Sequence, residues 1–454
     1  MNAVSRRFRL LHACYSFGAS IHFWLRCRIR RAGICALFAT SVTGFLSVGN
    51  PKAPVFQLFC FGLGLIVPTL LWTLFRRAKV HASLETARYA TVGETFHYSA
   101  TLYHHHRRIL RGLRLLQIPP DPRPSLSEFS QMEEPYERRR NFYDRKMAYF
   151  RWRWLISRRR SFTAEETSRN FDLPPRQRIT VHLSLTPCRR GVYLLDQLGL
   201  LMPDPLGFFQ KCKFLNPDPA HLIALPRRYR LPPFDMPGSG TFRIGGEDTS
   251  NSIGNAGEFI GLRDYRPGDP LRTIHWKSWA HTGKPIVKEL EDTCFPRYAM
   301  ILDTFAHSPD PTIFEEMISI TSSFISGLNQ QRSLIDLMFI AEKAHTVTAG
   351  RGLERTEKLL EVLAGLQIEP NERFNDLSAA VIGHRDHITS CLVILNGWNE
   401  SRRDFIQKMC KADIPCVPII VGSGEKPEHL IGHWIDSKHV ARYLMRLPTQ
   451  LTAI

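Results

Sequence analysis

Two uninterrupted apolar runs stand near the start of the chain. Gly33–Val48 and Val55–Phe75 contain no charged residue, and the second is long enough to span a membrane as a helix. The joining loop carries only Lys52, whereas arginines and lysines flank both outer ends. The positive-inside rule therefore predicts a two-helix transmembrane hairpin within residues 1–79, with both chain termini in the cytoplasm. The alternative is a cleaved signal peptide followed by one span, with the basic residues after Phe75 on the wrong side.

A different pattern begins after the second apolar run. Residues 94–103, 178–185 and 191–195 alternate apolar and polar positions, and Gly and Pro lie between these runs. Such spacing predicts short strands in a small antiparallel β-sandwich over residues 80–235.

Residues 121–172 interrupt this region with another composition. Arg138–Arg160 holds ten Lys/Arg and a single acid, Asp144, interleaved with six aromatic residues. Basic and aromatic side chains together suit an anionic lipid surface, and they also suit single-stranded nucleic acid. A solvated arm with a few anchoring aromatics is the plainer alternative. The neighbouring apolar runs favour lipid or a solvated arm over nucleic acid.

Strand and helix patterns alternate in the last part of the chain, residues 292–454. Residues 298–303, 334–340 and 391–395 are buried-type strands, and a helix with one apolar face follows Asp310–Pro311. Residues 416–421 are a further strand, which Pro418 places at a sheet edge. Alternation of this kind predicts an α/β domain with a mostly parallel, doubly wound sheet.

Composition adds two constraints. The chain has 454 residues, which indicates two or three domains, and its formal net charge of +18 favours anionic partners. Its ten cysteines include no CxxC pair. Neither a zinc site nor a disulfide framework is therefore indicated, and a reducing compartment fits.

The densest motif lies at the end of a segment assigned to residues 236–291. Its text is GEFIGLRDYRPGDPLRTIHWKSWAHTGKPIVKELE, from Gly257 to Glu291. Asp269 is suited to cap a helix, and Pro270 to its first position. The predicted helix covers residues 271–280, Gly283 ends it, and residues 285–290 form a strand.

Two interpretations of this signature block remain open. Its candidate residues are Glu258, Arg263, Asp264, Arg266, Asp269, Arg272, His275, Trp276, Lys277, Lys284 and Lys288. In an enzyme, His275 would shuttle a proton beside Glu258 or Asp264. In the other interpretation, acids and arginines form ion pairs that fix a turn and a helix. The block offers no Ser or Cys nucleophile with a matching base, so the structural interpretation is favoured.

The block resembles the hallmark of a bacterial family known as domain of unknown function fifty-eight. Weaker similarity lies at Arg190–Tyr193 and Asp204–Phe209, while the insertion at 121–172 departs from the family pattern. The resemblance implies a multi-pass protein of the inner (cytoplasmic) membrane with a C-terminal von Willebrand factor A-like domain. It also implies a MoxR-type AAA+ ATPase and neighbouring membrane proteins as partners. It names no reaction and no cofactor.

Domains of the von Willebrand factor A type commonly bind Mg²⁺ through an Asp-x-Ser-x-Ser loop after the first strand. Here Asp303 is followed by Phe305 and His307 at the two serine positions. A phenyl ring cannot ligate Mg²⁺, which prefers oxygen donors. We therefore expect no metal at this loop, and expect Asp303 to bond nearby backbone. Together these patterns predict a non-enzymatic, membrane-anchored scaffold or adaptor. An enzyme that uses the signature block is the alternative.

Overall fold

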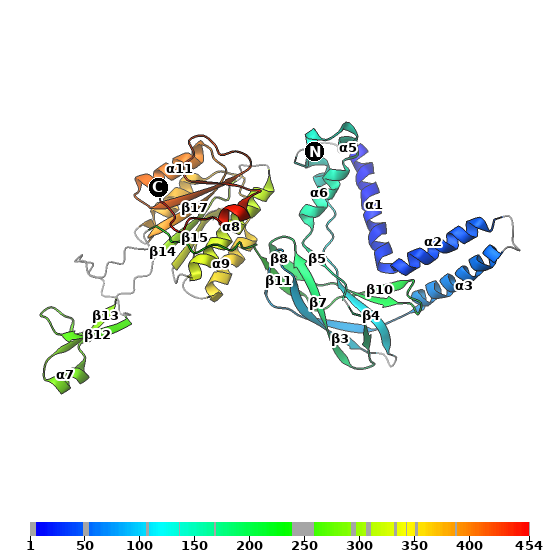
Figure 1. Cartoon of the computed structure of the whole chain (residues 1–454), viewed down its shortest axis with the longest axis horizontal. Helices are drawn as coiled ribbons and strands as arrows, with labels where there is room; N and C mark the ends of the chain where they lie inside the picture. The colour runs from blue at the N-terminus through cyan, green and yellow to red at the C-terminus, as the bar shows by residue number, and fades with distance from the viewer. Residues whose placement is uncertain are drawn as a thin grey trace. The chain divides into compact units, whose positions relative to one another are not determined.

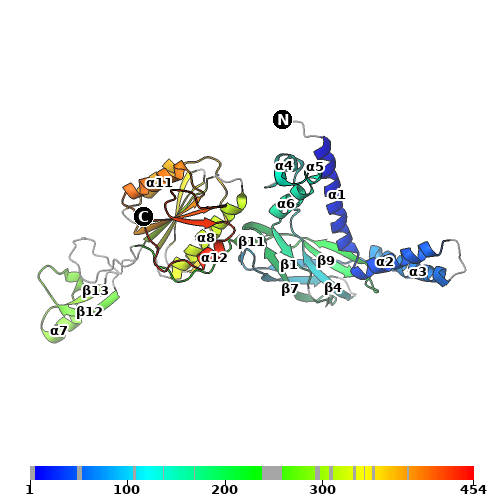
Figure 2. The ribbon, with the colours of Figure 1, turned by 45° about the horizontal axis from the view of Figure 1, so that its top comes forward.

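The structure is a computed structural model. It describes residues 6–48, 54–105, 109–135, 137–167, 169–237, 258–291, 297–305, 310–330, 334–341, 343–349, 353–385 and 388–453. The chain divides into two compact units, Met1–Arg227 with Leu360–Leu366, and Arg228–Leu359 with Gln367–Ile454. Figures 1 and 2 show the helices and strands of each unit.

Three helices open the first unit: α1 (Arg6–Arg28), α2 (Arg31–Leu46) and α3 (Pro54–Phe75). The sequence did not predict α1. Helices α2 and α3 lie side by side and approach closely at two glycines. A Cβ atom on Gly44 would lie 2.8 Å from the Phe59 ring, and one on Gly62 would lie 2.5 Å from Thr40 Oγ1. The absence of a side chain at these positions lets the two backbones pack together.

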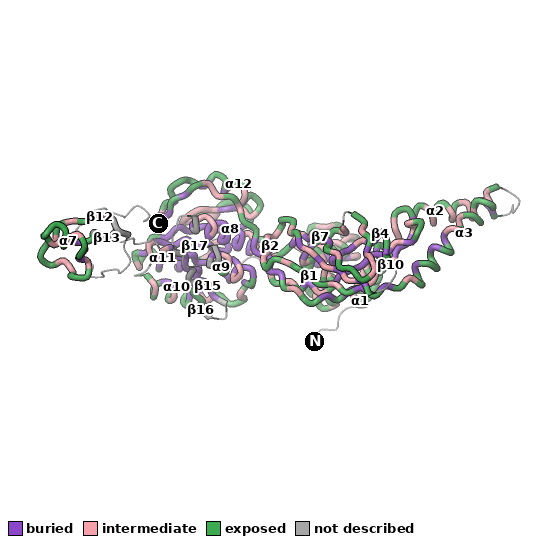
Figure 3. The backbone as a smooth tube through the Cα atoms, turned by 90° about the horizontal axis from the view of Figure 1, so that it is seen from below, coloured by how far each residue is buried: buried purple, intermediate pink, exposed green. Residues whose placement is uncertain are grey.

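One helix in the described part of the chain is long and apolar enough to cross a membrane. Helix α3 has 22 residues, and an 18-residue window within it has a mean hydropathy of 2.1. Helix α2 has 16 residues, which extend about 24 Å, against a hydrocarbon layer of about 30 Å. The sequence predicted two spanning helices, and only the second run forms a helix of spanning length. Both helices are largely exposed along their length (Figure 3).

The start of α2 and the end of α3 are both fixed to the β-strands of the first unit. The backbone N–H of Arg30 donates to Phe208 O at 3.1 Å, and Ile29 forms a β-bridge with Phe209. At the other end, Lys211 Nζ donates to Leu74 O at 3.0 Å. The two helices therefore leave and return to the same sheet.

The β-strands of the first unit form three sheets. The first sheet has the strand order β1 (Val80–Glu85), β3 (Phe96–His104), β7 (Arg178–Pro187), β5 (Phe162–Ala164). The second sheet has the strand order β10 (Gln210–Leu215), β9 (Leu198–Pro203), β4 (Leu110–Gln117), β6 (Phe171–Leu173). Both are antiparallel throughout. A small third sheet joins β2 (Tyr89–Thr91), β11 (Ala220–Leu225) and β8 (Gly191–Leu195). One apolar core draws on all three sheets, and the three strands predicted from the sequence are present.

The basic insertion is folded rather than a solvated arm. It forms α4 (Leu126–Gln131), α5 (Phe142–Met147) and α6 (Tyr149–Arg159), which pack with α1 around Phe129 and Trp152. The buried Arg151 guanidinium donates two hydrogen bonds to the Glu137 carboxylate, at 2.7 and 2.8 Å. The sequence missed this because the packing partner, α1, lies more than a hundred residues away.

A six-stranded mixed sheet forms the core of the second unit. Its order is β16 (Lys343–Ala349), β15 (Leu334–Ala341), β14 (Arg297–Leu302), β17 (Ser390–Asn396), β18 (Cys416–Gly422), β19 (His433–Asp436). Only β16 is antiparallel to its neighbour. Helices α8 (Pro311–Gln330), α10 (Phe374–Ile382), α11 (Glu400–Lys411) and α12 (Val440–Leu444) belong to this unit, and α9 (Leu353–Gly365) begins in it. The predicted apolar face of α8 is buried, from Phe314 to Leu328.

The edge position predicted for Pro418 is wrong. Strand β18 lies between β17 and β19, so both of its sides are paired. The ladder with β19 begins only at Ile419, opposite His433, which leaves Pro418 just outside it. A proline is tolerated there because the missing N–H is not needed by the β19 ladder.

Replacing Gly33 with alanine tests the attachment of α2 to the sheet. A Cβ atom at this position would lie 2.1 Å from Phe208 O, so the helix has to move away. We expect Gly33→Ala to lower the free energy of unfolding of the full-length protein in detergent by about 1–3 kcal/mol. Gly18→Ala in α1 is the control, since nothing lies within 4 Å of its Cβ. Equal stability of the two variants in urea titrations would contradict this packing.

Candidate functional site

The signature block forms a β-hairpin with a short helix. Strand β12 (Glu258–Asp264), which the sequence did not predict, pairs antiparallel with β13 (Ile286–Glu291), with an irregularity between Phe259 and Gly261. Helix α7 (Trp276–Thr282) lies between the two strands in the sequence. Gly283 ends α7 with a φ of 71°, as predicted.

The single helix predicted over residues 271–280 is wrong. A 3-10 turn covers Leu271–Thr273, and Ile274 is then extended and forms a β-bridge with Val287. The N–H of His275 also donates to Ile286 O at 2.8 Å. Both Ile274 and Val287 are buried, so apolar contact with the hairpin holds this segment extended against its helical pattern. Arg272 and His275 therefore do not continue the face of α7.

Asp269 closes a turn instead of capping a helix. Its carboxylate accepts two hydrogen bonds from Arg263, at 2.7 and 2.8 Å, and a third from the N–H of Arg266 at 2.8 Å. These donors lower the pKa of Asp269 to about 2. A carboxylate with so low a pKa is a weak base at neutral pH, so Asp269 is a structural residue of the turn.

For His275, the predicted acid–base role beside Glu258 or Asp264 stays a prediction. Its Nδ1 lies 2.6 Å from Ser278 Oγ, one turn along α7. The side chain of Glu258, its other expected partner, lies outside the described residues. Trp276 and Trp279 stack on each other with ring centroids 5.3 Å apart. The remaining charged candidates are exposed at the surface of the hairpin: Asp264, Arg266, Arg272, Lys277, Lys284 and Lys288.

A second cluster of candidate residues lies in the C-terminal sheet. The chain runs from β14 to β15 on one side, whereas β17, β18 and β19 lie on the other side. Asp303 directly follows β14, and Asn396 ends β17, so both lie where the strand order reverses. In open α/β sheets ligands bind at this point, outside the carboxyl ends of the strands.

An arginine from α11 occupies this position. Arg402 Nε donates to Asp303 Oδ2 at 2.8 Å, and both side chains are fully buried. Arg402 Nη1 donates to Glu372 Oε1 at 3.1 Å, and the guanidinium lies 5.2 Å from the centre of the Phe374 ring. The buried guanidinium thus links a carboxylate, a second acid and an aromatic face.

The backbone completes the coordination of Asp303. The N–H of Phe305 donates to Oδ1 and that of Asn396 to Oδ2, both at 2.9 Å. The sequence predicted such backbone bonds. Complete burial raises the pKa of Asp303, and Arg402 with the two N–H groups opposes that rise. The Phe305 ring is buried against Phe374, with centroids 4.7 Å apart, so it belongs to the core of the domain.

These residues do not fit a divalent cation. The guanidinium of Arg402 bonds the same carboxylate that would ligate Mg²⁺, and like charges repel. His307, at the second serine position of the loop, lies outside the described residues. Among the described residues, no three His, Cys, Asp or Glu side chains lie close enough to hold a metal ion.

Sequence reasoning missed Arg402 and Glu372. Asn399 caps α11 by accepting from the N–H of Arg402 at 3.0 Å. Arg402 is then the third residue of the helix, in its first turn. A basic residue there is unfavourable near the positive end of the helix dipole, and this was the available signal of a special role.

Comparison with known proteins adds a distant relative. The chain is 22% identical over 188 residues to the uncharacterized protein YeaD of Bacillus subtilis (strain 168), covering 41% of this chain and 45% of that protein. The chain thus matches less than half of the length of this relative. No protein-family model matches the chain, so the resemblance of the signature block to a family stays a prediction.

Two solved structures resemble parts of the chain with low TM-scores. One is the proximal thread matrix protein 1 from the mussel byssus, with a TM-score of 0.26, 12% identity, and coverage of 33% of this chain and 44% of that chain. Another is AvmM, which catalyses macrocyclization in alchivemycin A biosynthesis, with a TM-score of 0.17, 13% identity, and coverage of 32% and 88%. At scores this low, neither likeness bears on fold or function.

Removing one member of the buried ion pair tests its structural importance. In Asp303→Ala the Arg402 guanidinium stays buried but has lost the Asp303 carboxylate. We expect this to lower the free energy of unfolding by about 3–5 kcal/mol. We expect this loss in urea unfolding of the full-length protein in detergent. Asp303→Ala combined with Arg402→Met should recover part of it, because no charge then remains buried. Asp404→Ala, at an exposed site on α11, is the control. A loss as small as that of the control would overturn the assignment.

The response of the protein to Mg²⁺ tests whether the residues around Asp303 bind a divalent cation. Because Arg402 holds Asp303, we expect millimolar MgCl₂ and EDTA to give the same melting temperature for the wild-type protein. Calorimetric titration with MgCl₂ provides the direct check. Stoichiometric binding that is lost in Asp303→Ala would refute the prediction.

Proposed function

We propose that this chain is a non-enzymatic, membrane-anchored scaffold or adaptor that binds another protein at the carboxyl edge of its C-terminal sheet. The observation that carries the proposal is the buried pair of Asp303 and Arg402, which fills the ligand position of the sheet with the protein's own side chains. A closed edge of this kind offers its outer surface, not a pocket, to a partner.

The outer surface of this edge supports a protein contact. Trp398 is half-buried, Glu400 is exposed, and the side chain of Glu372 keeps a third of its surface exposed while it bonds Arg402. Aromatic residues are enriched in protein interfaces, and the rim of such an interface is polar. Loops that gather at the end of a rigid sheet are common binding surfaces.

The partner in this proposal is a MoxR-type AAA+ ATPase. This assignment rests on the resemblance of the signature block, together with a von Willebrand factor A-like interpretation of the α/β domain. The hairpin of β12 and β13 is a second contact surface, because its Arg263–Asp269 ion pair fixes the turn while Leu271 and Trp276 stay exposed.

Membrane attachment in this proposal uses α2 and α3 as one helical hairpin in the inner membrane. Both outer ends of the pair are tied to the same β-domain, so a crossing by α3 requires α2 to return through the same membrane. Both chain termini then lie in the cytoplasm with the β-sandwich-like domain.

The helical insertion adds a contact with anionic lipid. Phe142 and Tyr143, at the start of α5, are 72% and 70% exposed. They lie close in sequence to Arg145 and Lys146. Aromatic and basic side chains side by side suit the lipid headgroup region. This surface supplements the anchor and does not replace it.

A cross-linked pull-down from native membranes tests the adaptor proposal. We expect an AAA+ ATPase to be recovered with the wild-type protein and to be reduced about tenfold or more by Trp398→Ala combined with Glu400→Lys, because central aromatic and charged contacts carry most binding energy. Mass spectrometry identifies and quantifies it. The matched control is Lys411→Glu, at the opposite end of α11. Recovery of no ATPase, or equal recovery with both variants, would count against the proposal.

A further inference from the structure

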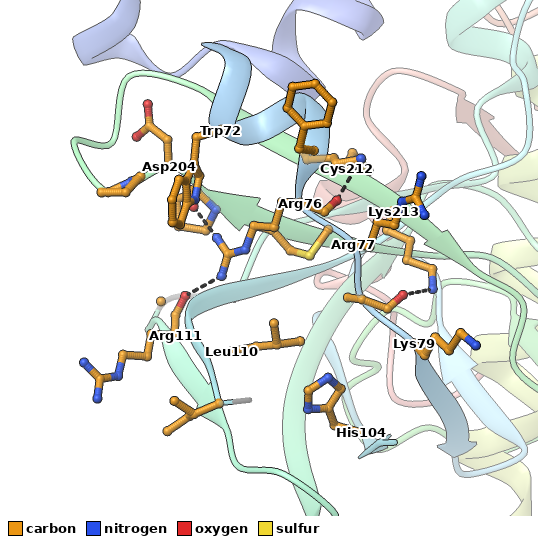
Figure 4. Close-up of a pocket in the computed structure, with 18 of the residues that line it drawn as sticks. Trp72, Arg76, Arg77, Lys79, His104, Leu110, Arg111, Asp204, Cys212 and Lys213 are labelled. Carbon is orange, nitrogen blue, oxygen red and sulfur yellow. Dashed lines mark hydrogen bonds between the residues drawn. The ribbon is translucent and has the colours of Figure 1, made fainter. Parts of the chain in front are cut away.

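A large hollow lies in the first unit where α3 meets the β-strands. Its volume is about 2260 Å³, and its walls come from the last turns of α3, the segment that follows it, and strands β4, β9 and β10 (Figure 4). The lining residues are far apart along the chain, so no single sequence motif contains them all.

Six cationic side chains line the hollow: Arg76, Arg77, Lys79, Arg111, Lys211 and Lys213. The one acidic residue in its lining is Asp204. Both Asp204 oxygens already accept hydrogen bonds from backbone N–H groups of its own loop, those of Gly207, Phe208 and Phe209. None of the six cations pairs with a carboxylate within the described part of the chain.

Backbone carbonyl groups hold three of these cations in place. Arg76 donates to Pro203 O, Lys211 to Leu74 O and Arg76 O, and Lys213 to Ala78 O (Figure 4). A carbonyl orients a cation without neutralising its charge. Burial lowers the pKa of Arg76, which means that its charge is partly removed from water. A bound anion would stabilise this arrangement.

The same hollow has an apolar wall on the side of the helix. Leu71, Trp72 and Phe75 belong to the end of α3 and are exposed, Phe75 to 79%. Arg77 and Lys79 follow directly in the chain. A lipid with acyl chains and an anionic headgroup would contact the apolar surface with its chains and the basic surface with its headgroup.

We propose that this hollow binds the phosphate headgroup of an anionic glycerophospholipid, with the acyl chains against the end of α3. The inference rests on the proposed insertion of α3 in the membrane. A soluble phosphate compound shares the headgroup chemistry, but it would leave the wall of Leu71, Trp72 and Phe75 without a contact. The lipid is therefore the ligand that uses both surfaces.

Native mass spectrometry of the full-length protein in detergent tests this site. Phosphatidylglycerol and phosphatidylcholine are added in separate titrations, and glycerol 3-phosphate serves as the soluble probe. The pocket variant is Arg77→Gln with Lys79→Gln and Arg111→Gln, at three exposed positions. The control variant removes three exposed cations of the α/β domain, through Arg403→Gln, Lys411→Gln and Lys438→Gln.

We expect phosphatidylglycerol to bind the wild type and the control alike, and the pocket variant about 100-fold more weakly, from a factor of about five for each cation removed. Phosphatidylcholine and glycerol 3-phosphate should bind far more weakly to all three. Equal binding of phosphatidylglycerol to pocket and control variants would overturn the site. Tight binding of glycerol 3-phosphate that excludes the lipid would assign the hollow to a soluble phosphate compound and overturn the lipid proposal.

Extraction of native membranes with alkaline carbonate separates this outcome from a failure of the proposed anchor. Release of the wild-type protein into the soluble fraction would refute the insertion of α3, and the lipid proposal with it. Retention of wild-type, pocket and control proteins together with equal lipid binding would refute the headgroup site alone.

Discussion

The C-terminal domain depends on the buried ion pair between Asp303 and Arg402. Transfer of both charges from water to a protein interior is costly, so the pair depends on the groups that surround it. Two backbone N–H groups bond the carboxylate, while Glu372 and the Phe374 ring take the other side of the guanidinium. These contacts join the loop after β14, the end of β17, the start of α10 and the first turn of α11. The carboxyl edge of the sheet is therefore fixed by side chains of this chain.

A comparable constraint governs the first unit. Helices α2 and α3 are joined to the same β-domain at their outer ends, through Phe208 and Lys211. A helix pair with both ends fixed cannot reorient one helix without the other. The small residues at Gly44 and Gly62 keep the pair closely packed, which suits an apolar environment, where packing rather than water exclusion drives association. In the proposed membrane attachment, the insertion of the helices and the placement of the β-domain are therefore one geometric problem.

Local pattern predicted those parts of the fold whose stability is local. The apolar face of α8, the strand β8 and the helix end at Gly283 all follow from spacing within one element. Prediction failed where distant contacts decide. Ile274 is extended because Val287 pairs with it, against the helical pattern of its neighbours. Helix α1 needs the insertion as its packing partner, and the pairing of Arg402 with Asp303 joins residues 99 positions apart. The periodic pattern of a single element does not include both partners of such contacts.

The same distinction explains why the basic hollow escaped notice in a chain with a net charge of +18. Excess positive charge indicates an anionic partner but does not say where it binds. In the insertion, where the sequence concentrates basic residues, Glu134, Glu137 and Glu128 neutralise three of the arginines. At the foot of α3, cations from three separate parts of the chain converge, and the one acid is occupied by its own loop. The proposed headgroup site therefore rests on uncompensated charge, not on the density of basic residues, and that charge lies beside the apolar end of α3.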